Sequence, residues 1–139
     1  MKILFLDIDG VCNSANYSRT RAKGGMLDID LTAAAIAKRI IAETNCSVVL
    51  SSSWRLDKHL REDVRASVCD FIDVTPDNRG RTDRGCEVIA WMGQHPEVTV
   101  HAILDDDADF HKDQPLFRTS WETGITDEIA DAVIKHLNR

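Results

Sequence analysis

The sequence predicts an α/β fold built around a mostly parallel sheet of five strands. Short apolar segments alternate along the chain with segments of helical periodicity, which is typical of a parallel sheet with helices between its strands. Residues 2–8 are almost continuously apolar, as is typical of a strand that is covered on both faces. We therefore expect this first strand to lie at the centre of the sheet.

The first half of the chain continues with two helices and a second strand. Residues 10–28 contain glycines and polar residues, which indicates a long excursion after the first strand. A helix follows over 30–44, where alanine and isoleucine recur at helical spacing. The second strand, 47–50, is rich in β-branched valine. Ser53 is a favoured N-cap residue and predicts a helix that runs to Val68.

The second half supplies three more strands and two helices. The third strand, 71–74, is short and is followed by a polar loop that contains a proline. A helix over 85–93 leads to the fourth strand, 98–104, and the fifth strand is 116–119. The last helix, 126–137, begins at a threonine, which is a favoured N-cap residue.

Length and composition indicate one soluble domain that spans residues 1–139. The apolar share of 43% and the charged share of 29% are ordinary for a globular protein. No apolar run approaches the length of a membrane span, about 18 residues, and Asp7 interrupts the apolar N-terminus too early for a signal peptide. We expect a cytoplasmic protein with no membrane partner, and the sequence does not indicate its oligomeric state.

Net charge and cysteine spacing exclude two further classes of protein. A net charge of −6 excludes a general attraction to nucleic-acid backbones and leaves only a local basic patch. The cysteines form no C-x-x-C pair, and none has a histidine at zinc-finger spacing. We therefore expect free thiols in a reducing compartment. The cysteines are Cys12, Cys46, Cys69 and Cys86.

Acidic residues follow the two longest apolar strands. Asp7 and Asp9 end the first strand, and Asp105 and Asp106 end the fourth. Ligands of open α/β sheets lie beyond the carboxyl ends of the strands. If the two strands are neighbours, these carboxylates repel one another unless a cation lies among them, and such hard oxygen ligands suit Mg²⁺. A single aspartate at a strand end often only starts a turn, but two clusters favour a metal site.

A serine run and two arginines complete the candidate site. Ser51 ends the second strand, where its hydroxyl and neighbouring N–H groups can hold a phosphate oxygen. Ser52 continues the run and serves either a phosphate or a helix cap. Arg55 follows the second strand and Arg84 follows the third. Arginine suits bidentate phosphate recognition, although each arginine could instead be a solvated loop residue.

In this order the motifs resemble those of the haloacid dehalogenase (HAD) superfamily. Residues 3–11 match an apolar strand followed by Asp-x-Asp-Gly, and residues 48–51 match an apolar strand that ends in serine. Arg84 takes the place of the basic third motif, where lysine is usual, and residues 102–106 match an apolar strand that ends in paired acids. The resemblance implies a three-layer Rossmann-like fold.

A narrower resemblance suggests the substrate. The segments 51–55, 84–89, 104–106 and 119–126 resemble the small HAD domains of "Swiss Army Knife" RNA-repair proteins and their phage relatives. That resemblance implies phosphates at nucleic-acid ends as the substrate.

The HAD resemblance also implies a mechanism, that of a Mg²⁺-dependent phosphomonoesterase. Asp7 would attack phosphorus to form an aspartyl-phosphate, and Asp9 would act first as general acid and then as general base. Mg²⁺ would be bound by the carboxylates of Asp7 and Asp106 and by the main-chain carbonyl of Asp9. Asp105 would lie next to these ligands without binding the ion. The phosphate-binding residues would be Ser51, Ser52, Arg84 and Arg55, the last of which could also brace the acids.

Three other functions stay open at this point. One is a phosphatase of small molecules such as nucleotides or sugar phosphates. Another is a receiver-like signalling domain, which is disfavoured because Asp73 lies inside the third strand and no adjacent acid pair follows the first. The third is a catalytically silent phosphate-binding module, against which the intact pair of Asp7 and Asp9 argues.

Many HAD enzymes carry a large cap domain, but this chain leaves no room for one. About 20 residues separate Gly10 from the first helix, and about 10 separate the third strand from the next helix. Both stretches are too short for a separate core. We expect residues 10–28 to form only a short flap insert. The open site could then admit the end of an oligonucleotide. The cations expected to contact neighbouring phosphates are Arg19, Arg21, Lys23, Arg79 and Arg81.

Overall fold

The strands form one sheet, and their order confirms the predicted architecture. The computed structural model describes residues 1–21, 28–78, 80 and 82–139. The strands are β1 (Lys2–Leu6), β2 (Ser47–Leu50), β3 (Asp73–Val74), β4 (Val100–Asp105) and β5 (Leu116–Arg118). Within the described residues they lie in the order β3-β2-β1-β4-β5, and every neighbouring pair is parallel. The first strand is therefore central, as predicted.

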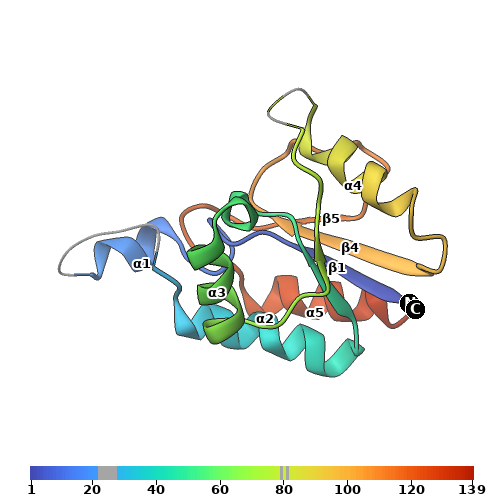
Figure 1. Ribbon diagram of the computed structural model, residues 1–139. Coiled ribbons are helices and arrows are strands. Elements are labelled where there is room, and N and C mark those ends of the chain that lie inside the picture. The colour runs from blue at the N-terminus through green and yellow to red at the C-terminus, as the bar shows by residue number, and fades with distance from the viewer. Residues whose placement is uncertain (22–27, 79, 81) are drawn as a thin grey trace.

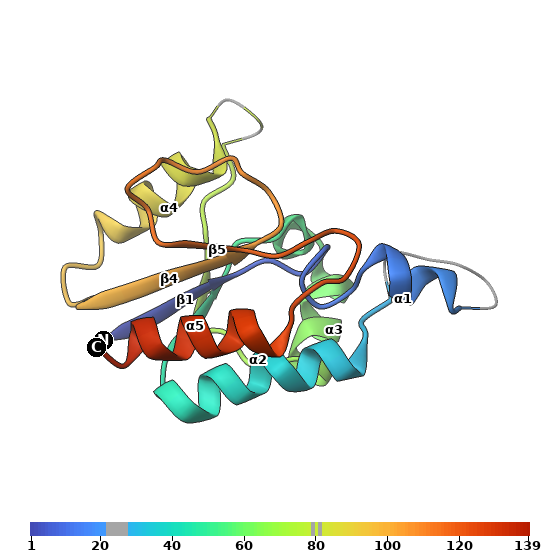
Figure 2. The ribbon, with the colours of Figure 1, turned by 180° about the vertical axis from the view of Figure 1, so that it is seen from behind.

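Helices cover both faces of this sheet and complete the expected three layers. The helices are α1 (Ala15–Arg19), α2 (Leu31–Thr44), α3 (Lys58–Ser67), α4 (Arg84–Met92) and α5 (Asp127–Leu137), with a short 3₁₀ helix, η1, at Ser53–Leu56. Figure 1 and Figure 2 show α2 and α5 side by side on one face of the sheet and α4 on the other. None of the helices in the described ranges is both long enough and apolar enough to cross a membrane.

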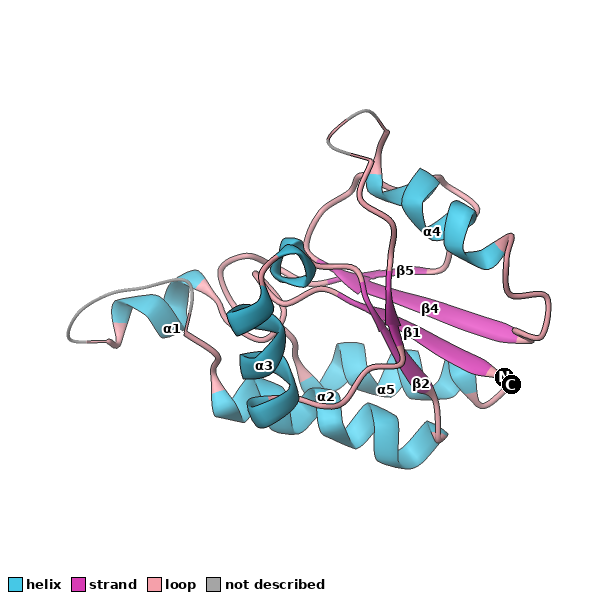
Figure 3. Ribbon diagram, in the orientation of Figure 1, coloured by secondary structure: helices cyan, strands magenta, loops and turns pink. Residues whose placement is uncertain are grey.

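Side chains of β1 alternate between two cores, one on each face of the sheet. Leu4 and Leu6 are fully buried in a core that includes residues of α2 and α5. Ile3 and Phe5 are fully buried in a second core that includes residues of α4. Figure 3 shows the strands lying between these helices. The continuous apolar run at the N-terminus is therefore explained by burial on both faces.

The predicted helix from Ser53 to Val68 is wrong, because the chain forms η1 and α3 in its place. Asp57 separates the two with extended backbone, at φ −119° and ψ 127°. Its carboxylate accepts a hydrogen bond from the N–H of Leu60 at 3.0 Å and caps α3. An aspartate that caps the next helix in this way competes with continuation of the preceding one.

The first and third strands are shorter than the sequence predicts. β1 ends at Leu6 rather than at Ile8, because the N–H groups of Val11 and Cys12 both donate to the carbonyl of Ile8 and turn the chain. β3 begins only at Asp73. The other predicted boundaries are unchanged or shift by one or two residues.

The expected flap, 10–28, contains α1 in its described part and no separate domain. α1 is anchored at its start, where the N–H of Ala15 donates to the carbonyl of Trp121 at 2.9 Å. The next residue, Asn16, donates in the same way to Glu122 at 3.0 Å. The described residues therefore place no cap domain over the sheet. Three cations expected to contact a polymer lie outside the described residues: Lys23, Arg79 and Arg81.

Removal of the Thr126 hydroxyl, which caps α5, should lower the free energy of unfolding. The hydroxyl of Thr126 accepts a hydrogen bond from the N–H of Ile129 at 3.3 Å. Thr126→Ala leaves that N–H without its cap, so the free energy of unfolding should fall by about 1 kcal/mol. Thr32→Ala, at an exposed position in α2, is the matched control and should change stability little. Chemical denaturation measures both, and an equal loss in the two variants would contradict the role of the cap.

Candidate functional site

Parallel pairing continues one residue past several strands and aligns the candidate site. The N–H of Asp7 donates to the carbonyl of Leu104 at 3.0 Å, and the N–H of Ser51 donates to that of Leu6 at 3.0 Å. Thr75 is held in the same way at the end of β3. The residues that directly follow β1, β2 and β3 therefore share the carboxyl edge of the sheet, where ligands of such folds bind.

Three carboxylates crowd together at this edge. Oxygens of Asp7, Asp105 and Asp106 lie within 4.8 Å of one another, and the first two side chains are buried. Burial raises the pKa of Asp7 well above its ordinary value, and the Asp105 carboxylate raises it further. The pKa of Asp106 is also raised, by burial first and then by Asp105. The charged forms of Asp7 and Asp106 therefore carry a free-energy cost in the folded protein.

Arg84 supplies positive charge to the group from the first residue of α4. Its Nη1 lies 2.5 Å from Oδ2 of Asp105 and 3.5 Å from Oδ1 of Asp7. Burial opposes the guanidinium charge, but the carboxylates of Asp7 and Asp105 outweigh it and raise the pKa of Arg84. The structure therefore places Arg84, the predicted basic residue, next to these acids.

One guanidinium cannot offset three carboxylates, so the group suits a divalent cation. Hard oxygen donors of this kind favour a cation such as Mg²⁺. The side chain of Asp105 belongs to the group, although its two oxygens are also engaged by Arg84 and by the N–H of Asp107. The carboxylate of Asp9 lies outside this group, so only its main-chain carbonyl stays a predicted ligand.

Gly10 makes room for the Asp106 carboxylate. Its φ of +78° belongs to the left-handed region that glycine tolerates best. A Cβ built on Gly10 would lie 2.3 Å from Oδ2 of Asp106. The hydroxyl of Thr119 donates to the carbonyl of Gly10 at 2.6 Å and fixes the turn from the other side. A larger residue at position 10 would displace one of the acids.

Asp9 is oriented by a neighbour that sequence reasoning did not single out. Nδ2 of Asn13 donates to Oδ1 of Asp9 at 2.8 Å, and Oδ1 of Asn13 accepts from the N–H of Gly10 at 2.9 Å. The amide therefore holds the Asp9 carboxylate relative to the turn that follows β1.

Two hydroxyls at this edge are buried without a hydrogen-bond partner among the described residues. They are Oγ of Ser51 and Oγ1 of Thr75. A buried hydroxyl without a partner costs free energy, which a ligand oxygen at the same place would recover. Ser51 was predicted to hold phosphate and remains available for it. Thr75 was missed, and the only signal for it is its place directly after the third strand.

Ser52 and Arg55 are engaged by the protein itself. Oγ of Ser52 accepts from the N–H of Trp54 at 3.2 Å and caps η1. Arg55 is buried and pairs with Glu87 of α4 at 3.1 Å. Its remaining N–H groups donate to backbone carbonyls of Ser51, Ser52, Thr75 and Pro76. Because an arginine has five N–H groups, these contacts disfavour direct phosphate contact. None of them is to an aspartate of the site, so Arg55 joins backbone segments to α4 rather than bracing the acids.

The chain matches a known family of protein domains. A model of the family described as "HAD domain in Swiss Army Knife RNA repair proteins" matches residues 3–130. No curated protein and no solved structure is significantly similar to the chain.

Neutralising Asp7 should stabilise the metal-free protein. Because burial and Asp105 raise the pKa of Asp7, stability falls as pH rises from its ordinary pKa through the raised one. Asp7→Asn removes this charge at nearly constant shape, so its melting temperature at neutral pH in a chelator should exceed that of the wild type by a few degrees. The difference should shrink in acid, where Asp7 of the wild type takes up a proton.

Thermal denaturation at several pH values makes this measurement. Asp63→Asn is the matched control because Asp63 is an exposed carboxylate of α3. A melting temperature of Asp7→Asn at or below that of the wild type would show that the crowded acids do not oppose folding.

Proposed function

The chain belongs to the family of HAD domains in Swiss Army Knife RNA repair proteins, and on that basis we propose that it is a Mg²⁺-dependent phosphomonoesterase. The family supports a phosphatase-type hydrolase in general. The observation that carries the finer proposal is the buried Asp7 carboxylate beside Arg84, on the same sheet edge as the unpartnered hydroxyl of Ser51. A nucleophile, a cation and a free hydroxyl at one edge suit a phosphoryl group.

The proposed reaction proceeds in two steps at Asp7. In the first, a carboxylate oxygen of Asp7 bonds to phosphorus while the bond from phosphorus to the leaving oxygen breaks. Asp9 gives its proton to that leaving oxygen. In the second, Asp9 takes a proton from water as the water oxygen attacks phosphorus, which frees inorganic phosphate and restores both carboxyl groups. Asn13 supports this role because it holds Asp9 in place.

Ser51 and Arg84 would bind the phosphoryl oxygens. The Ser51 hydroxyl has no competing partner among the described residues, and Arg84 is already fixed by Asp105. The positive charge of Arg84 would offset the negative charge of the phosphate as it approaches Asp7. Lysine is usual at this position of the superfamily, and the planar guanidinium offers two parallel N–H groups where lysine offers a point charge.

The acidic group would hold the metal ion. Asp7, Asp106 and the main-chain carbonyl of Asp9 are the proposed ligands, while Asp105 positions Arg84. When bound, Mg²⁺ would supply Lewis-acid stabilisation of charge on the phosphoryl oxygens and reduce the repulsion between phosphate and carboxylate. The fit rests on the donor set, which consists of hard oxygens with an excess of negative charge.

We further propose that the substrate is a phosphorylated nucleic-acid end. The matched family is named for RNA repair proteins, and the described residues place no separate domain over the sheet edge. An edge of this kind is accessible to the end of a chain. A small-molecule phosphatase is the competing function, and substrate length separates the two.

Asp7→Asn should abolish phosphate release, because it removes the nucleophile. Asp9→Asn should lose about 100-fold or more, the usual contribution of a general acid and base. The measurement is Mg²⁺-dependent phosphate release, followed by acid quenching and mass spectrometry for a phosphoryl group on the peptide that contains residue 7. The wild type or Asp9→Asn should carry that group, and Asp7→Asn should not.

Asp63→Asn serves again as the control and should keep wild-type turnover. Full activity of Asp7→Asn, with deamidation excluded by mass spectrometry, would contradict the assignment of the nucleophile. A phosphoryl group on another carboxylate would contradict it equally.

Catalytic efficiency should rise with the first few nucleotides of a phosphorylated oligonucleotide. Each additional phosphate contact with the protein releases counterions, so the gain should diminish as salt is added. The measurement is kcat/KM against oligonucleotide length at several salt concentrations, with 5′- and 3′-phosphorylated series. A flat dependence, or a mononucleotide as the best substrate, would contradict the polymer proposal and favour a small-molecule phosphatase.

A further inference from the structure

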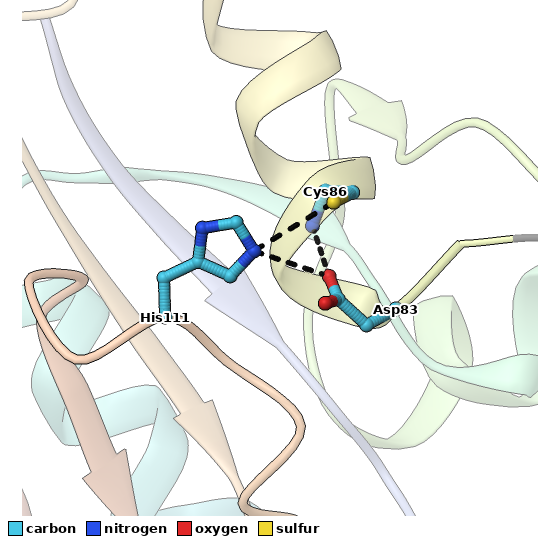
Figure 4. A group of neighbouring side chains, drawn as sticks. All are labelled: Asp83, Cys86 and His111. Carbon is cyan, nitrogen blue, oxygen red and sulfur yellow. Dashed lines mark hydrogen bonds and ion pairs between the residues drawn. The ribbon is translucent and has the colours of Figure 1, made fainter.

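A second group of potential ligands lies apart from the crowded carboxylates. Asp83 and Cys86 come from the start of α4, and His111 comes from the loop between β4 and β5 (Figure 4). One carboxylate oxygen, the sulfur and one imidazole nitrogen lie within 4.8 Å of one another. Figure 4 shows all three side chains pointing toward a common point. None of them has a part in the proposed reaction.

Two distances within this group match those between ligands of one metal ion, and the one between His111 and Asp83 is also long for an N–H···O hydrogen bond. Nε2 of His111 lies 3.4 Å from Oδ1 of Asp83 and 3.6 Å from Sγ of Cys86. An N–H···O hydrogen bond is usually about 2.7–3.2 Å long. With tetrahedral angles and bonds of about 2.3 Å to sulfur and about 2.1 Å to nitrogen and oxygen, ligand atoms stand about 3.6 Å (S···N) and about 3.4 Å (N···O) apart.

The use of one imidazole nitrogen argues against a cysteine–histidine–aspartate catalytic triad. In such a triad the histidine faces the nucleophile with one ring nitrogen and the acid with the other. Here Nε2 of His111 faces both Cys86 and Asp83. Because the same nitrogen faces the sulfur and the carboxylate oxygen, all three atoms can bind one ion that lies between them.

Hydrogen bonds from the backbone and from the Gln114 side chain hold the His111 loop against the start of α4. The N–H of Gly85 donates to the carbonyl of Asp109 at 3.0 Å, and Nε2 of Gln114 donates to the carbonyl of Gly85 at 3.0 Å. Oε1 of Gln114 accepts from the N–H of His111 at 2.8 Å. A Cβ on Gly85 would lie 2.9 Å from Cδ2 of His111, so glycine is needed for this close approach. The ligand set is thus built into the fold.

We propose that Asp83, Cys86 and His111 bind a transition-metal ion, for which Zn²⁺ is the best match. Sulfur, nitrogen and oxygen donors together suit this borderline-soft ion, whereas Mg²⁺ selects oxygen donors. With three protein ligands, the fourth position would be open to water. The side chains of Asp83 and His111 are 38% and 39% exposed, so the ion can enter from solvent.

The ion would join the start of α4 to the loop that follows β4. Arg84 lies between Asp83 and Gly85 in the chain, and its guanidinium reaches Asp7 and Asp105. Metal binding would therefore restrict the helix end that carries Arg84. The proposed site does not depend on the phosphatase activity, and it can be tested without substrate.

Cobalt(II) is the probe, because it replaces Zn²⁺ and gives a sulfur-to-metal absorption band only when a thiolate is bound. The reduced, chelator-treated full chain should develop this band with one Co²⁺ per molecule, and Zn²⁺ should abolish it. Cys86→Ser should show no band. His111→Gln should bind Zn²⁺ at least about 100-fold more weakly. A residue that only hydrogen-bonds to a metal ligand would cost less than this when it is replaced. A competing chromophoric chelator measures that affinity.

Two variants serve as controls. Cys69→Ser removes a half-buried thiol that is not part of the group and should keep the band. Asp7→Asn should also keep it, because the crowded acids offer no sulfur. Absence of the band in the wild type, its loss in Cys69→Ser, or unchanged Zn²⁺ affinity in His111→Gln would overturn the proposal. Circular dichroism confirms that each variant is folded.

Discussion

Repulsion among three carboxylates at the carboxyl edge of the sheet is the constraint on which the rest of the site depends. Asp7 and Asp105 are held close by neighbouring parallel strands, and Asp106 joins them across Gly10. The Asp105 carboxylate raises the pKa values of Asp7 and Asp106 in addition to the effect of burial, and charges buried so near one another oppose folding. Arg84 compensates only part of this charge. The remaining negative charge favours a bound metal ion. That ion would also offset the negative charge of a phosphoryl group at the site.

The surrounding structure keeps the acids from moving apart. The Thr119 hydroxyl donates a hydrogen bond to the carbonyl of Gly10. This bond keeps the turn after β1 from moving away from Asp106. On the other side, the buried pair of Arg55 and Glu87 joins the end of β2 to α4, the helix that carries Arg84. These residues do not touch the proposed reacting atoms. They hold in place the groups that do, and this explains why so much buried polar structure lies around a small site.

Asp7 and Ser51 could be predicted because strand ends are visible as apolar runs, and a parallel sheet brings such ends together. The central position of β1 followed from the same pattern. Asp57 was placed inside a helix because periodicity does not reveal which aspartate will act as a cap. The partnership of Arg55 with Glu87 joins residues far apart in sequence. Spacing alone could not show that Arg55 is satisfied by protein oxygens rather than by phosphate.

The central claim is that Asp7 accepts a phosphoryl group whose oxygens are held by Ser51 and Arg84. A crystal structure of the protein with Mg²⁺ and beryllium trifluoride, which binds a carboxylate as a phosphoryl mimic, tests it most directly. We expect beryllium bonded to a carboxylate oxygen of Asp7, with fluorines in contact with the Ser51 hydroxyl and the Arg84 guanidinium. Beryllium on another carboxylate, or fluorines that leave the Ser51 hydroxyl without a partner, would contradict it.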